Sequence, residues 1–241
     1  MSDGELLVKE KEIVVPGEEL ARGLGFLPSK GTYRNGESIR ANRLGLVEID
    51  GKVIKLVSLS GCYLPKAGDV IITQVFDITF SGWRLDTATA YPAMLGMKDA
   101  TSDYINRGAD LTSYFKLGDY LVVKIINVTS QNLIDVTLKG PGLRKLQGGR
   151  IFKVNPNKVP RIIGKQGSMV SMIKLATNCK IIVGQNGLIW IEGTPQEEKV
   201  AVDTILMIER EAHKSGLTDR VKAYLEKETG KVIENNPPVQ R

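Results

Sequence analysis

The alternation of apolar and polar side chains in the first 140 residues predicts short strands rather than long helices. Apolar runs such as LGLVEI and KVIKLVSL are only a few residues long, and Gly, Pro, Asn or Asp bounds each one. The sequences RNGE and IDGK have the composition of turns, and Asp50-Gly51 is a pair typical of a tight hairpin. We therefore expect residues 1–60 to form a small all-β domain.

A second β domain is expected over residues 61–139. Gly68-Asp69 and Gly118-Asp119 each open an apolar run, and Ser81-Gly82 turns the chain between two further runs. The stretch 93–114 between them is expected to be irregular and exposed. Five strands in about 75 residues are typical of an OB-type Greek-key barrel.

The apolar period changes from that of strands to that of helices beyond the glycine-rich segment 140–150, which we interpret as a linker. Asn157 is placed to cap a short helix that ends at Ile163, and a second helix should run from Gly167 to about Thr177. Two strands are expected at 179–183 and 188–192. The pattern predicts an α+β domain over 151–235 and a disordered tail at 236–241.

The start of a further helix is marked by Thr194-Pro195-Gln196-Glu197, a capping box with proline at the first helical position. The helix should stop near Ser215-Gly216. A last amphipathic helix carries Val221 and Leu225. The apolar stripe expected on the helix after the capping box consists of Val200, Ile205, Ile208 and Ala212.

The net charge of +6 is unevenly distributed. Residues 1–59 carry nine basic and nine acidic side chains, residues 60–138 carry six and eight, and residues 139–180 carry ten basic and no acidic ones. An acid-free stretch of this kind suits a polyanion such as nucleic acid. We name residues 139–180 the basic stretch, and its cations are Lys139, Arg144, Lys145, Arg150, Lys153, Lys158, Arg161, Lys165, Lys174 and Lys180.

The first of two Gly-x-x-Gly motifs, Gly164-Lys165-Gln166-Gly167, lies between two expected helices. Glycines let the backbone turn sharply without a Cβ, so a sugar-phosphate backbone can approach the amides at the start of the following helix. Lys165 supplies charge at the loop tip. The order β, α, Gly-x-x-Gly, α, β, β, α is that of a KH domain, so we predict that this loop binds single-stranded RNA.

The second motif, Gly184-Gln185-Asn186-Gly187, joins two expected strands. Asn-Gly supplies the positive φ that a tight hairpin needs, so turn formation accounts for Gly184, Asn186 and Gly187. We predict that the first loop binds a ligand and that the second only folds.

Several short sequences occur together in a specific order: VPGEEL and GTYRNGE, then YLPKAGDVI and GWRLDT, then RIIGKQGS and GQNG followed by LIWIEG. In this combination the chain resembles the KH-containing RNA-binding cap subunit of the archaeal exosome, and the resemblance covers nearly the whole chain. It implies an N-terminal small all-β domain, an OB-fold β-barrel of S1 type and a C-terminal type I KH domain.

The resemblance also implies a function. Cap subunits of this family are non-catalytic, and three copies sit on a hexameric ring of RNase PH-like proteins, where they guide single-stranded RNA toward the central pore for degradation and processing. In that family the N-terminal β domain makes much of the contact with the ring, and the barrels line the entrance. We therefore expect RNA and the ring as partners, with no DNA and no membrane.

The candidate RNA-binding residues fall into two groups. Many S1-type barrels present an aromatic pair after the turn in the second strand, whereas here Trp83 is followed by Arg84, so we expect Trp83 in the core. The barrel instead offers cations for the RNA backbone, namely Lys66, Arg84, Arg107 and Lys116. The KH loop offers Arg161, Gly164, Lys165, Gln166, Gly167 and Ser168.

No motif of an enzyme, metal site or cofactor site is recognisable in the sequence. His213 is expected to cap a helix, and Asp99 with Asp103 offers too few carboxylates for a hydrolytic nuclease. Cys62 and Cys179 are expected as reduced core residues. Since no apolar run approaches the length of a membrane span, we expect a cytoplasmic protein without cofactors.

Two other functions stay open at this point. The chain could be a nuclease or phosphorolytic enzyme, although polynucleotide phosphorylase carries its KH and S1-type domains in the opposite order, behind a long catalytic core that is absent here. It could also be a free-standing RNA-binding protein that acts in translation.

Overall fold

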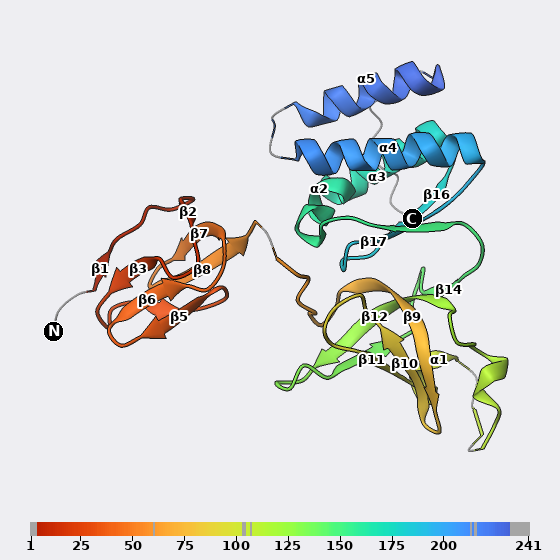
Figure 1. Cartoon of the computed structure of the whole chain (residues 1–241), viewed down its shortest axis with the longest axis horizontal. Coiled ribbons are helices and arrows are strands. Elements are labelled where there is room, and N and C mark those ends of the chain that lie inside the picture. The colour runs from red at the N-terminus through yellow and green to blue at the C-terminus, as the bar shows by residue number, and fades with distance from the viewer. Residues whose placement is uncertain are drawn as a thin grey trace. The chain divides into compact units, whose positions relative to one another are not determined.

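The computed structural model describes residues 4–59, 61–102, 105–106, 108–212, 214 and 216–231. The chain divides into two compact units, residues 1–62 (unit 1) and 63–241 (unit 2) (Figure 1). Among the described residues, no helix combines the length and the apolar character needed to cross a bilayer.

Unit 1 is built from two small sheets around one core of Val14, Leu20, Ile39, Ile54 and Leu56. Both hairpins expected from the sequence are present, with Gly36 at φ +61° and Gly51 at φ +60°. One sheet has the order β1 (Glu5–Leu6), β3 (Glu19–Arg22), β6 (Ser38–Ala41) and β5 (Thr32–Asn35). The other has the order β2 (Ile13–Val14), β7 (Gly45–Asp50), β8 (Val53–Ser58) and β4 (Leu27–Pro28).

The first part of unit 2 is the expected OB-fold barrel. Its strands are β9 (Val70–Thr79), β10 (Gly82–Asp86), β11 (Ala93–Gly96), β12 (Tyr120–Val128) and β13 (Ile134–Thr137). They pair in the closed order β9-β10-β11-β13-β12-β9, in which β11 and β13 are parallel and the other neighbours are antiparallel. Leu85, Leu95, Leu121 and Ile125 fill its interior.

Two expectations for this region were wrong. The stretch 93–114 is not uniformly irregular and exposed, because it contains the barrel strand β11, the helix α1 (Met97–Ala100) and the 3-10 helix η1 (Leu111–Ser113), with Leu95 and Leu111 buried. The segment 140–150 is not a simple linker either. It contains β14 (Arg144–Leu146), which pairs with β12 and buries Leu146 against the KH domain.

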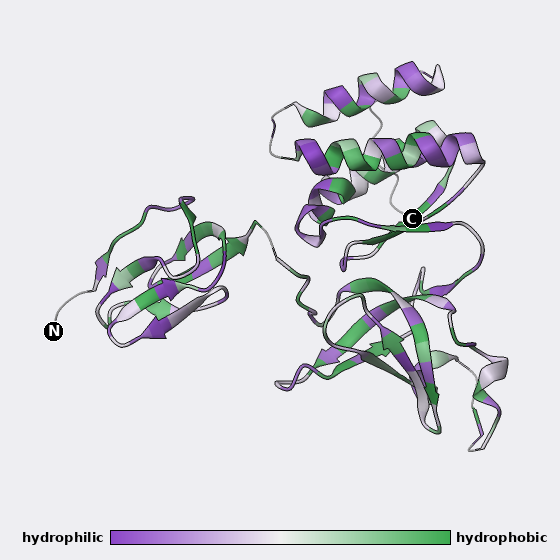
Figure 2. Ribbon diagram, viewed as in Figure 1, coloured by the Kyte–Doolittle hydropathy of each residue, from purple (hydrophilic) through white to green (hydrophobic). Residues whose placement is uncertain are grey.

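The second part of unit 2 is a KH domain of type I. Its antiparallel sheet has the order β15 (Arg150–Lys153), β17 (Leu188–Glu192) and β16 (Lys180–Val183). Its helical elements are η2 (Pro156–Lys158), α2 (Val159–Ile163), η3 (Lys165–Gly167), α3 (Ser168–Thr177), α4 (Pro195–Glu211) and α5 (Leu217–Thr229). Figure 2 shows green and purple alternating along α4 and α5, as expected for helices with one buried face.

The KH sheet is buried on both faces. Ile189 and Ile191 of β17 pack against the helices, whereas Trp190 between them packs against Ile72 and Val122 of the barrel. In Figure 1 the sheet accordingly lies between the helices and the barrel. Because barrel and KH domain share this core, they form one unit.

Several local predictions can be checked in the KH domain. Both the end of α2 at Ile163 and the capping box at Thr194 are confirmed. Asn157 does not cap α2, because the N-cap of that helix is Lys158, whose side chain forms no capping bond; Asn155 instead caps the preceding η2 by accepting from the Asn157 backbone amide. The helix α4 ends at Glu211, and its buried residues are Ala201, Thr204, Ile205 and Ile208. Val200 is partly buried and packs against the same core as Ile205 and Ile208, whereas Ala212 is the C-cap beyond the helix.

The two cysteines differ from each other. Cys179 is buried as expected, but Cys62 is exposed, so its assignment to a core was wrong. His213, Asp103, Arg107 and the tail 236–241 lie outside the described residues.

Candidate nucleic-acid interface

The first Gly-x-x-Gly loop connects α2 to α3 through a sharp change of chain direction. Gly164 has φ +75° and ψ 176°, Gln166 adopts the left-handed conformation with φ +53° and ψ +28°, and Gly167 has φ +79°. The side chains of Lys165 and Gln166 are exposed at the tip, with Ser168 exposed behind them. The loop thus presents its polar residues and the first turn of α3 to solvent.

The two glycines of this loop serve different purposes. A Cβ at Gly164 would lie 2.7 Å from Cβ of Met169 and 2.8 Å from its backbone nitrogen, so the contact with α3 itself requires glycine there. A Cβ at Gly167 would meet nothing within 4 Å, and its positive φ is the requirement. Gly164 therefore serves packing, whereas Gly167 borders open space that a ligand can approach.

The charge near this loop is not neutralised. Arg161 and Lys165 are exposed and form no ion pair with any described residue. Elsewhere in the basic stretch, Lys180 pairs with Glu192 at 3.0 Å, and Lys145 pairs with Asp119. Among the described residues, the cations of the basic stretch are therefore paired at Lys145 and Lys180 and unpaired at the loop, where they are available to an anion.

The second Gly-x-x-Gly loop is buried against the barrel. The Asn186 side chain is 1% exposed; its amide nitrogen donates to Ile72 O at 2.7 Å and to Thr87 O at 2.8 Å, and its Oδ1 accepts from Ile72 N at 3.3 Å. The backbone amide of Gln185 also donates to Val70 O at 2.9 Å. The loop thus occupies the free edge of β9 beyond the point where β10 stops pairing.

The prediction that turn formation alone accounts for this loop was therefore incomplete. The turn is present, since Gly187 N donates to Gly184 O at 3.0 Å and Gly187 has φ +85°. The positive φ falls on Gly187 and not on Asn186, whose side chain joins the KH domain to the barrel. A buried amide that satisfies backbone groups of another domain is a structural connection.

The barrel cations expected to contact RNA are dispersed. Lys66 and Lys116 are exposed, each in a turn that precedes a strand. Arg84 on β10 lies over the ring of Phe76, 5.3 Å from its centroid, and 3.6 Å from Asp77. Because Asp77 already pairs with the Arg84 guanidinium, Arg84 is less available to bind an RNA phosphate. Arg107 lies outside the described residues.

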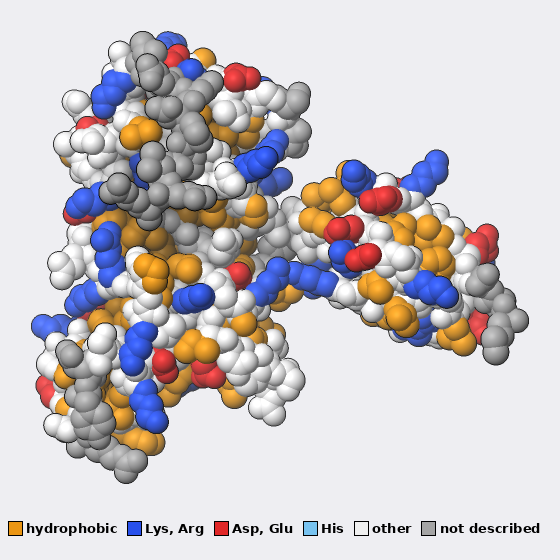
Figure 3. Space-filling view, turned by 180° about the vertical axis from the view of Figure 1, so that it is seen from behind, with side chains coloured by type: hydrophobic (Ala, Val, Ile, Leu, Met, Phe, Trp, Pro, Cys, Tyr) orange, Lys and Arg blue, Asp and Glu red, His pale blue; other side chains and the backbone are white. Residues whose placement is uncertain are grey.

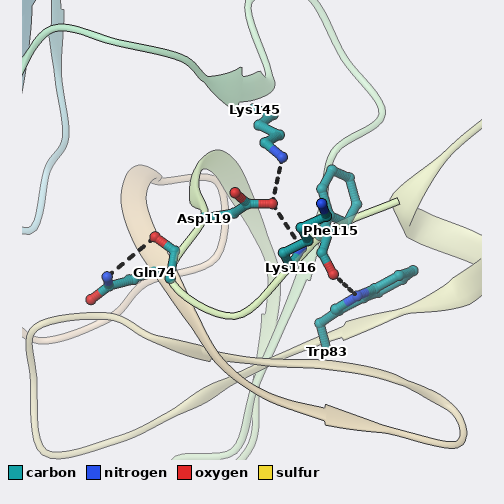
Figure 4. A network of polar contacts seen from close by, with 7 residues as sticks. Gln74, Trp83, Phe115, Lys116, Asp119 and Lys145 are labelled. Atoms are coloured by element: carbon teal, nitrogen blue, oxygen red, sulfur yellow. Dashed lines mark hydrogen bonds and ion pairs between the residues drawn. The ribbon is translucent and has the colours of Figure 1, made fainter. Parts of the chain in front are cut away.

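Trp83 is a core residue, as expected. It is fully buried, its Nε1 donates to Phe115 O at 3.2 Å, and the Phe115 ring packs edge-on at 5.1 Å (Figure 4). In the same region Asp119 accepts from the amide of Lys116 at 2.7 Å and from the ammonium of Lys145. These bonds, with burial acting against them, hold the pKa of Asp119 below its usual range.

Phe80 is an exposed aromatic that the sequence reasoning missed. It lies at the tip of the β9–β10 hairpin, is 95% exposed, and borders a largely apolar hollow of about 610 Å³. The hollow is also lined by Met97 of α1 and by Leu111. A phenylalanine inside a polar turn was the available signal, because an aromatic in that position cannot pack against its own hairpin.

The described residues contain no group of three or more His, Cys, Asp or Glu side chains that could hold a metal ion. Asp99 lies in α1, and its backbone oxygen accepts from Leu138 N at 2.8 Å.

Comparison with known proteins gives consistent results. A family model described as a KH domain matches residues 149–197. The chain is 42% identical to Exosome complex component Rrp4 of Methanothermobacter thermautotrophicus, over 93% of this chain and 71% of that protein. It is 43% identical to the protein of the same name from Thermococcus kodakarensis, over 92% and 87%. A crystal structure provisionally assigned as an exosome complex RNA-binding protein is 35% identical, with a TM-score of 0.63, over 70% of this chain and 97% of that one.

Proposed function

The chain belongs to the Rrp4 family of archaeal exosome components, and on that premise we propose that it recruits single-stranded RNA and guides it into a degrading ring. It is a non-catalytic RNA-binding subunit of the exosome. The observation that carries the proposal is the exposed Gly-x-x-Gly loop of the KH domain with its unpaired cations Arg161 and Lys165.

RNA contact at this loop follows from its geometry. The backbone amides at the start of α3 lie beside Gly167, where no side chain blocks the approach of a phosphate. Lys165 and Gln166 are free to turn toward the strand, and the Ser168 hydroxyl can donate. Lys66 and Lys116 would add weaker contacts to the RNA backbone from the barrel, with Arg84 and Arg107 in the same role.

Unit 1 is the proposed docking domain for a hexameric ring of RNase PH-like subunits, with three copies of this chain per ring. Ile13, Leu46 and Val57 are cross-strand neighbours on β2, β7 and β8, and Ile13 and Val57 are 61% and 50% exposed. Figure 3 shows several hydrophobic side chains, interspersed with charged ones, on the visible face of this unit. An apolar row on a domain with balanced charge favours protein contact over RNA contact.

Co-purification from an archaeal extract tests this function. The full chain should bring down a stable ring, and a chain lacking residues 1–60 should lose the ring while unit 2 stays folded. The isolated chain should bind RNA with a steep dependence on salt, prefer it to DNA of the same sequence, and degrade neither with phosphate and Mg²⁺. Recovery of ribosomes or initiation factors instead of a ring would favour a role in translation. Fractionation should place the protein in the cytoplasm.

A further inference from the structure

A hollow of about 610 Å³ lies at one end of the barrel, between the β9–β10 hairpin and the segments that carry α1 and η1. The tip of this hairpin projects from the lower end of the barrel in Figure 1. We name the cavity the Phe80 hollow. Its apolar lining comes from Ile78, Phe80, Met97, Ala109 and Leu111.

The turn of the hairpin holds Phe80 outward. Phe80 and Ser81 form a two-residue turn between Thr79 and Gly82, which pair with each other across the hairpin. The Thr79 hydroxyl donates to Gly82 O at 3.0 Å, and the backbone amide of Met97 donates to Ser81 O at 3.3 Å, so the tip is bonded to its own hairpin and to α1. Gly, Asn, Asp and Ser are the usual residues of tight turns. Turn formation therefore does not account for a phenylalanine that is 95% exposed.

The wall opposite Phe80 is apolar and firmly supported. Leu111 of η1 belongs to the barrel core, and Met97 and Ala109 pack against the same core. A single exposed apolar side chain on a protein surface needs no explanation. An exposed aromatic ring beside an apolar hollow, however, is typical of a surface that contacts another molecule.

The charge at the Phe80 hollow is negative. Asp110 lines it, and no described Lys or Arg does. The Thr112 hydroxyl and backbone amide donate to Asp110 Oδ1 at 2.6 and 2.9 Å, and these bonds hold the pKa of the carboxyl below its usual range. Asp110 Oδ2 accepts no hydrogen bond from any described residue. The hollow thus offers an ionised oxygen to a cation and repels a phosphate.

The size of the Phe80 hollow limits what can occupy it. Ten described residues line it, whereas a stable interface between two folded proteins uses about 20–30 residues on each side. A stable dimer of this chain is therefore not expected there, and a short peptide segment fits better. Such a segment gains from apolar contact with Phe80 and from a charge-assisted hydrogen bond to Asp110.

We propose that the Phe80 hollow docks a short segment of another protein, in which an apolar side chain lies against Phe80 and Leu111 and a neighbouring lysine or arginine pairs with Asp110. This docking goes beyond the proposed RNA-binding function and does not depend on it. It gives one end of the barrel a part in attaching a protein partner.

Selection of a random peptide library on the full chain, followed by titration of the selected peptides, tests the docking. The selected peptides should share an apolar residue close to a lysine or arginine. Phe80→Ser should weaken their binding at least about tenfold. Asp110→Asn should weaken it roughly threefold and remove its dependence on salt. Both variants should fold, because serine suits the turn and asparagine can still cap η1.

Phe76→Ser and Asp135→Asn are the matched controls. Phe76 lies on β9 and Asp135 on β13, and both side chains are exposed without lining the hollow. Peptide binding should be unchanged in both. Selected peptides that lack the apolar and basic pair, or that bind Phe80→Ser as tightly as Phe76→Ser, would overturn the docking.

Two further measurements separate the other possible occupants. Phe80→Ser should bind labelled oligouridylate as tightly as the unaltered chain does, and a loss of RNA affinity would make Phe80 a base-stacking residue instead. Sedimentation velocity should show no self-association that depends on Phe80. If the unaltered chain associated with itself and Phe80→Ser did not, a second copy of this chain would be the occupant, and docking of another protein would be wrong.

Discussion

The two Gly-x-x-Gly loops lie in one domain and share one spacing, yet their surroundings are opposite. The loop 164–167 is exposed at its tip, where Lys165 forms no ion pair with a described residue. The loop 184–187 is buried, and Asn186 forms hydrogen bonds with the barrel at Ile72 and Thr87. Glycine spacing fixes how the chain turns, but the groups that lie beyond the turn decide whether the loop stays open to a ligand or is buried against protein.

Gly187→Val should have the largest effect. It places a β-branched residue at φ +85°, and its Cβ would lie 2.4 Å from Val154 O. Strain of this kind, together with the collision, should lower the free energy of unfolding by more than about 3 kcal/mol in urea titrations.

Gly167→Ala is the control for that change, because Gly167 has a similar φ and no atom within 4 Å of the added Cβ. It should cost only about 1 kcal/mol. Equal destabilisation by the two substitutions would contradict the distinction between the loops.

Asn186→Ala should have the second largest effect on stability. It leaves Ile72 O, Ile72 N and Thr87 O without the partner that the side chain supplies, so the unfolding free energy should fall by about 2–4 kcal/mol. Thermal melts of unit 2 measure this loss of stability. Gln185→Ala is the control, because the bond from Gln185 to Val70 O is donated by the backbone amide, which the substitution leaves in place. A melting temperature for Asn186→Ala as high as that of the control would show that these bonds contribute little.

Changing Lys165 and Gln166 to Asp should leave the unfolding free energy within about 0.5 kcal/mol, because both side chains are exposed. The added negative charge should repel phosphate and weaken RNA binding roughly tenfold. Titration with labelled RNA measures the loss. Lys165→Asp alone and Lys227→Asp on α5 change the charge equally, so the second is the control for charge in the first. If the double variant bound RNA as well as the control, the first loop would be a turn like the second, and RNA contact would have to be sought in the barrel.

A rise in pH through the pKa of Lys174, which lies between the two loops in the sequence, should have the smallest effect on stability and RNA binding. Its side chain is exposed overall, but partial burial of the ammonium group lowers its pKa below the ordinary value of 10.5. As the pH rises through that lowered pKa, loss of the proton relieves the cost of burying a charge, so stability should rise slightly while RNA binding weakens. Lys174→Arg should abolish the alkaline loss of RNA affinity, as followed by titrations at increasing pH. An identical pH profile for both proteins would exclude Lys174 as its source.

The features that the sequence alone determined are those with local causes. The capping box at Thr194, the helix between Gly167 and Thr177, and the hairpins at Gly36 and Gly51 depend on residues within a few positions of one another. The helical and strand periods placed a KH domain after a barrel. The first loop was identified as the candidate RNA site by the same local reasoning, although its contact with RNA stays a prediction.

What only the tertiary structure decided depends on partners distant in the chain. The strand β11 was missed because its pairing with Ile134 and Val136 of β13 leaves no trace in its own four residues. The role of Asn186 was missed because Asn-Gly already satisfies a hairpin, and nothing nearby indicates a partner 99 or 114 residues away. Local propensity selects the conformation of a short segment, but burial depends on which surfaces the fold brings together. For that reason one Gly-x-x-Gly is exposed in this protein and the other is part of its core.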